Sequence, residues 1–134
     1  MDTIIFIIET RDNNLNDTVA IPLVNGRSVI DLIKEVEMNY DVSIAGAYDG
    51  IRPDLLFDEL TNGSTHDSTK SKVLECDCGV DGCWSLLVKV SQGDETVSWS
   101  QFSQMHRDNW DYSILGEFVF SKDEYLTALN TLKA

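Results

Sequence analysis

The chain has 134 residues, of which 43% are hydrophobic and 25% are charged, a composition typical of one folded domain and not of a disordered segment. Its 10 basic residues are outnumbered by 23 acidic ones, which gives a formal net charge of −13. Because this charge repels phosphate backbones and anionic lipid headgroups, direct binding to nucleic acid or to a membrane is not expected. A single domain over residues 1–134 is predicted.

The first 38 residues predict two strands followed by a helix. Apolar runs over 3–8 and 19–24 are separated by a polar turn, as in paired strands. Ser28 stands three residues before Asp31 at the head of an apolar pattern with helical spacing. This is the signature of a capped helix start, and it predicts a helix over 29–38.

The middle of the chain carries weaker signals. Residues 42–48 are apolar and predict a short extended segment. Pro53 opens a short helical turn that ends near Leu60. Residues 61–70 are small and polar without an apolar period, so a long loop is expected there, and a long loop in a small domain is often functional.

The second half predicts an antiparallel meander and a final helix. Strands are expected over 72–78, 83–90 and 96–102, separated by glycine-containing turns. A further extended piece over 118–120 precedes a capping box formed by Ser121 and Glu124. The final helix is predicted over 122–132, and the residues expected to face the sheet are Tyr125, Leu126, Leu129 and Leu132.

Together these elements predict an α+β fold, mainly an antiparallel sheet with a meander in the second half, packed with two main helices. The first apolar run lacks a basic leader and a cleavage site, and no apolar stretch approaches the roughly 20 residues that span a bilayer. We therefore expect a cytoplasmic protein. Strand order and the oligomeric state are left open, although the charge favours a monomer.

Three cysteines fall within eight residues, as Cys76, Cys78 and Cys83. An odd number in one cluster disfavours a disulfide framework, so buried thiols are predicted. The alternative is a zinc site with His66 or His106 as the fourth ligand, although the spacing differs from that of common zinc motifs. A redox role is a third reading. No metal and no cofactor are predicted.

The chain carries no sequence pattern of an enzyme. It has no phosphate-binding glycine loop and no metalloprotease or serine hydrolase motif. His106 and Arg107 lack a nucleophile at a defined distance, and we expect Arg107 to pair with a carboxylate. We therefore predict a protein without catalytic residues. A small enzyme acting on a basic substrate is the least supported alternative.

The last 60 residues combine a Cys-x-Cys-Gly-x-x-Gly-Cys hairpin, Val-x-Trp, a His-Arg pair, Trp-x-Tyr and Phe-x-Phe before a Tyr. The matching residues are Cys76, Cys78, Gly79, Gly82, Cys83, Val97, Trp99, His106, Arg107, Trp110, Tyr112, Phe118, Phe120 and Tyr125. This block resembles a group of small acidic bacterial proteins, some of them similar to immunity proteins of contact-dependent growth inhibition and other polymorphic toxin systems. Met105 and Glu117 stand where the pattern would have proline.

The resemblance implies a protein that binds and neutralises a cognate toxin domain, a basic nuclease in our reading, as a 1:1 complex. The alternative is a structural or regulatory domain with a zinc site in the cysteine hairpin. An acidic chain suits a basic partner through steered association, and aromatic side chains on loops are good interface anchors. The predicted partner-binding residues are Asp49, Asp54, Asp58, Glu59 and Asp67, with Trp110 and Asp111 as a second patch.

Overall fold

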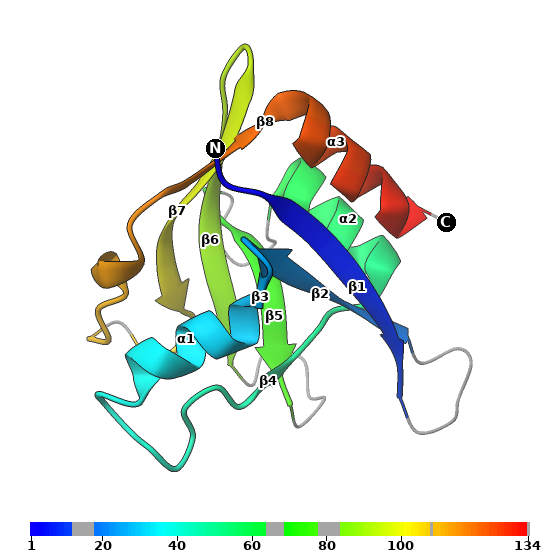
Figure 1. Ribbon diagram of the computed structural model, residues 1–134. Helices are drawn as coiled ribbons and strands as arrows, with labels where there is room; N and C mark the ends of the chain where they lie inside the picture. Colours follow the sequence, from blue (N-terminus) through cyan, green and yellow to red (C-terminus); the bar gives the residue numbers. More distant parts are fainter. Residues whose placement is uncertain (12–17, 64–68, 78–83, 108, 134) are drawn as a thin grey trace.

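The computed structural model describes residues 1–11, 18–63, 69–77, 84–107 and 109–133. Within these ranges the strands form two antiparallel sheets and three α-helices pack against them, which confirms the predicted α+β class (Figure 1). The strands are β1 (Ile4–Thr10), β2 (Thr18–Val24), β3 (Arg27–Ser28), β4 (Tyr48–Asp49), β5 (Ser71–Cys76), β6 (Ser85–Gln92), β7 (Thr96–Gln104) and β8 (Phe118–Ser121).

The smaller sheet has the order β1-β2-β3, and the larger one has the order β4-β5-β6-β7-β8. Every pair within the sheets is antiparallel, so the predicted meander is confirmed in β5, β6 and β7. The three helices are α1 (Val29–Glu37), α2 (Pro53–Asn62) and α3 (Lys122–Asn130). Short 3-10 turns follow at η1 (Ser113–Leu115) and η2 (Thr131–Lys133).

Two of the predicted helix starts are confirmed by their capping contacts, and the third is confirmed by Pro53 as the first residue of α2. The Ser28 hydroxyl accepts a hydrogen bond from the Ile30 amide at 3.2 Å at the start of α1. The Ser121 hydroxyl accepts one from the Glu124 amide at 3.1 Å at the start of α3. These caps satisfy amides that have no partner within the first helical turn.

Three expectations differ from the structure. The short turn after Pro53 is a full helix, α2, so there are three main helices and not two. Residues 42–46 form turns, and only Tyr48–Asp49 is extended, because the chain bends there to bring the Gly46 amide to a buried carboxylate. Leu126 is 43% exposed and does not face the sheet, since the buried side of α3 is formed by Tyr125, Ala128 and Leu129.

The core lies between the two sheets and beneath the helices. At its centre the Trp99 indole donates to the Tyr125 hydroxyl at 3.1 Å, and Phe120 packs edge to face on Trp99 at 5.8 Å. All three side chains are fully buried, so the strongest aromatic contacts join β7, β8 and α3.

Two isolated bridges join the sheets to each other. The Asp2 amide donates to the Val119 carbonyl at 2.9 Å, which links the chain just before β1 to β8. The amide of Ala20 in β2 donates to the carbonyl of Ile51 at 2.7 Å. Strand pairing therefore continues from one sheet to the other at two places around the core.

The second bridge leaves no room for a side chain at Gly50. A Cβ added there would lie 2.4 Å from the Ala20 carbonyl oxygen and 2.8 Å from the Ile21 side chain. We expect Gly50→Ala to lower the free energy of unfolding by about 2–3 kcal/mol, because the two sheets must separate locally. Urea unfolding measures this change.

Gly93→Ala is the matched control, since the nearest atom to its added Cβ is a side-chain oxygen of Thr96 at 3.3 Å. Equal stability of the two variants would show that the bridge between Ala20 and Ile51 does not hold the sheets together.

Candidate partner-binding surface

Two of the predicted acidic residues have structural partners within the chain. Asp49 receives two hydrogen bonds from the Arg11 guanidinium, at 2.6 and 2.8 Å, and this contact holds the pKa of the Asp49 carboxyl below its ordinary value. The Glu59 carboxylate accepts the Lys72 amide at 2.6 Å at the beginning of β5. Both carboxylates therefore form hydrogen bonds within the fold and are poor candidates for partner contacts.

Asp54 and Asp58 are exposed on α2, as expected for a binding role. Asp54 pairs with Arg52 at 2.7 Å, and Asp58 accepts a hydrogen bond from Asn62 at 2.7 Å. Between them Leu55 is 46% exposed. We call Asp54, Leu55 and Asp58 the α2 face. Asp67, also predicted, lies outside the described residues.

Trp110 and Asp111 are part of a surface whose other half sequence reasoning missed. The Tyr40 and Trp110 rings stack with their centroids 5.3 Å apart and their planes at 15°. The Tyr40 hydroxyl accepts the Asp111 amide at 2.9 Å. Tyr40 follows α1 and Trp110 follows β7, so the fold brings together segments 70 residues apart.

Exposed apolar and acidic side chains lie close in sequence to each member of this stacked pair. Val42 is 67% exposed and Ile114 on η1 is 84% exposed. The full set, which we call the Tyr40–Trp110 surface, is Met38, Tyr40, Asp41, Val42, Trp110, Asp111 and Ile114.

The carboxylates of this surface are ionised at neutral pH. Hydrogen bonds from the Ser43 side chain and amide lower the pKa of Asp41. The Ser113 amide does the same for the pKa of Asp111, at 2.8 Å. Two negative charges therefore lie next to the stacked pair, in which Tyr40 is exposed and Trp110 is half-buried.

Arg107 packs against Trp110, and the described residues contain no carboxylate that forms the predicted ion pair with it. Its guanidinium lies 5.4 Å from the Trp110 ring centroid, a cation–π contact. No carboxylate of the described residues lies within 4.0 Å of it, and its buried Nε has no hydrogen-bond partner among them. The Trp110 ring therefore contacts both Tyr40 and Arg107.

The buried carboxylate of Glu37 connects the two segments that form this surface. Glu37, the last residue of α1, is fully buried, and its side chain accepts hydrogen bonds from the hydroxyls of Tyr48, at 2.5 Å, and Tyr112, and from the Gly46 amide at 3.0 Å. Gln104 of β7 donates to the Tyr48 hydroxyl at 2.8 Å. Glu37 is three residues before Tyr40 and Tyr112 is two after Trp110, so this hydrogen bond couples both halves of the surface.

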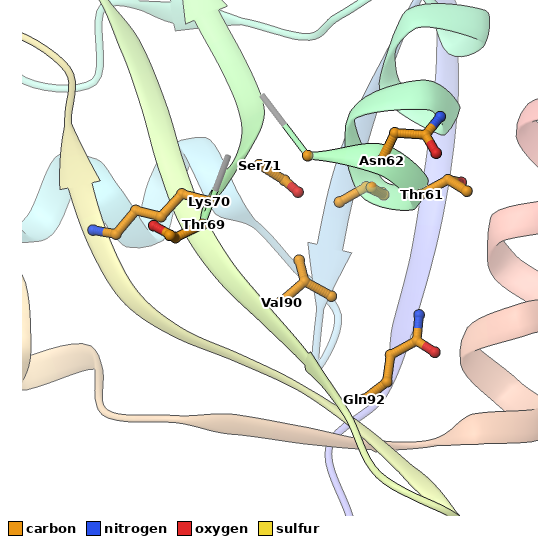
Figure 2. A pocket seen from close by; sticks show the side chains of 9 residues that line it. Thr61, Asn62, Thr69, Lys70, Ser71, Val90 and Gln92 are labelled. Carbon is orange, nitrogen blue, oxygen red and sulfur yellow. The ribbon is translucent and has the colours of Figure 1, made fainter. Parts of the chain in front are cut away.

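A hollow elsewhere on the molecule has a different lining. Figure 2 shows one of about 210 Å³ between the end of α2 and strands β5 and β6. Lys70 extends away from Thr61 and Asn62, and its ammonium donates to the Ser103 hydroxyl at 2.9 Å. The Ser71 hydroxyl donates to the Glu59 carbonyl. Of the described residues that line this hollow, none is a histidine, cysteine or carboxylate.

The prediction of a free thiol at Cys76 is wrong, because Cys76 is disulfide-bonded, although it is buried as expected. The predicted positions Cys78, Cys83 and His66 lie outside the described residues. A disulfide sulfur offers no thiolate, so Cys76 in this form does not support the zinc alternative. Disulfides persist mostly in oxidising compartments, and the cytoplasmic prediction does not account for this bond.

Comparison with protein family models, with curated proteins and with solved structures gives no match to this chain. The resemblance to immunity proteins therefore stays a prediction. Within the described residues, no helix has the length and hydropathy needed to cross a membrane.

The buried tyrosines predict a loss of stability in alkali. Burial is the main cause that raises the pKa of Tyr48 and Tyr112, followed by their hydrogen bonds to Glu37, and burial raises the pKa of Tyr125 to about 12. Because each folded pKa lies above the unfolded value, stability is unaffected below about pH 10 and falls above it, by about 1.4 kcal/mol per pH unit for each tyrosine.

Urea unfolding between pH 7 and pH 11, with tyrosinate absorbance read in parallel, measures this dependence. Tyr112→Phe removes one of the three groups, so its stability should fall less steeply with pH. A flat stability profile up to pH 11 would contradict the burial of these hydroxyls.

Proposed function

We propose that this chain is an immunity protein that binds a cognate toxin domain, a basic nuclease, and neutralises it by covering its active site or substrate groove. It acts by binding and not by catalysis, as a monomer that forms a 1:1 complex. The proposed place of action is the cytoplasm of a bacterial cell that carries a polymorphic or contact-dependent toxin system, where Cys76 would be kept as a reduced thiol.

The observation that supports this proposal is the acidic excess, 23 acidic against 10 basic residues, with carboxylates held at an exposed surface. A nuclease holds its substrate through basic side chains, so an acidic protein competes for the same surface. Opposite charges also accelerate encounter, and rapid association is needed to intercept a toxin before it acts. Asp54 and Asp58 on α2 are exposed and serve this steering role.

Coexpression tests the function itself. The reading frame immediately upstream of this gene, which the proposal expects to encode the toxin domain, is expressed with and without the chain, and growth and copurification are measured. We expect restored growth and a 1:1 complex. Failure of both would overturn the immunity proposal and leave no support for a toxin partner.

Charge reversal on the α2 face tests the steering role. We expect D54K/D58K to slow association with a catalytically inactive toxin domain about tenfold at low salt, with little change in the dissociation rate, because exposed charges act mainly on encounter. Glu59 is left unchanged, since its carboxylate holds the Lys72 amide.

The control is the same pair of measurements at 0.5 M salt, where screening should remove most of the difference between variant and wild type. An association rate that matches wild type at low salt would mean that the α2 face does not steer the partner.

A further inference from the structure

We infer that the Tyr40–Trp110 surface supplies the binding energy for the partner. The segment that docks on it carries an apolar side chain flanked by lysine or arginine. This inference deepens the proposed function and rests on it, because it requires a basic protein partner. The α2 face would then govern how fast the complex forms, and the Tyr40–Trp110 surface how long it lasts.

The first reason is the chemistry of the exposed side chains. Binding energy at protein interfaces is concentrated in a few Trp, Tyr and Arg residues near the centre of the contact. Here Tyr40 stacks on Trp110, and Trp110 also contacts the Arg107 guanidinium, with Tyr40 43% exposed. The α2 face has no aromatic residue among Asp54, Leu55 and Asp58, so it lacks such a centre.

The second reason is that these side chains are ordered before any partner arrives. The Tyr40 ring is held by stacking and its hydroxyl by the Asp111 amide at 2.9 Å. Beneath it the buried Glu37 carboxylate accepts the Tyr112 hydroxyl and joins the two supporting segments. Immobilising a flexible side chain costs about 0.5–1.5 kcal/mol on binding, and this surface avoids most of that cost.

The third reason concerns the occupant. The Asp41 and Asp111 carboxylates are exposed beside the apolar side chains. When an apolar side chain of the partner docks here, the partner residues next to it face negative charge. A lysine or arginine on each side of that group complements them. A second copy of this chain is disfavoured, because each copy carries a net charge of −13.

Dissociation kinetics test the inference. The probe is the catalytically inactive toxin domain, and the variants are Tyr40→Ala and Trp110→Ala. We expect each variant to bind at least about 30-fold more weakly, almost entirely through faster dissociation, as for a residue at the centre of an interface.

One substitution serves as the matched control. Leu126 on α3 is 43% exposed, the same as Tyr40, and lies on neither proposed binding surface. Leu126→Ala should dissociate within about twofold of wild type, because its side chain does not belong to the stacked aromatic pair.

Folding is checked by thermal unfolding, since Trp110 also packs against the core. If Trp110→Ala fails to fold, Tyr40→Ala decides the question, supported by D41K/D111K at exposed positions. A weakened complex for Tyr40→Ala supports the inference.

The failures are distinguishable. Wild-type binding and rescue, with Tyr40→Ala and D41K/D111K dissociating like wild type, would overturn the inference and leave the immunity function standing. Absence of both wild-type binding and rescue would overturn the proposed function, and the inference with it.

Discussion

The buried carboxylate of Glu37 determines how the segments that carry Tyr40 and Trp110 are arranged. Burying a carboxyl group in a protein interior costs several kcal/mol unless its oxygens are hydrogen-bonded. Three donors from distant segments meet that requirement, namely Tyr48, Tyr112 and the Gly46 amide. These hydrogen bonds therefore connect the end of α1 to three segments, which are the turn at 42–46, the start of β4 and the segment after Trp110.

This network explains what could and could not be predicted from the sequence. Helix caps are local signals, so Ser28 and Ser121 revealed the starts of α1 and α3. Glu37 gave no such signal, because a glutamate at the end of an amphipathic helix ordinarily faces solvent. Its burial depends on Tyr112, 75 residues further along the chain, and no periodicity reports a contact at that separation.

The same limit applies to the predicted binding residues. The sequence identifies a carboxylate by its residue type. Residue type does not distinguish a carboxylate that attracts a partner from one that forms hydrogen bonds within the fold. Asp49 is used by Arg11 and Glu59 by the Lys72 amide, whereas Asp54 and Asp58 remain at the surface. Trp110 and Asp111 were identified because aromatics in a non-periodic segment indicate an interface, yet the stacking partner Tyr40 lies in another part of the chain.

The acidic excess and the aromatic pair answer different physical requirements. Exposed ion pairs contribute about 0–1 kcal/mol each and are screened beyond about 10 Å in ordinary salt, so charge alone attracts a partner without holding it. Holding it requires desolvated apolar contact made by side chains that are already ordered. In the described part of the chain, stacked aromatics and ionised carboxylates share one exposed surface where the Glu37 network joins α1 to the segment after β7. An acidic protein that must bind quickly and release slowly needs both exposed charge and ordered aromatic side chains. In this chain the buried Glu37 holds the aromatic pair in place before a partner binds.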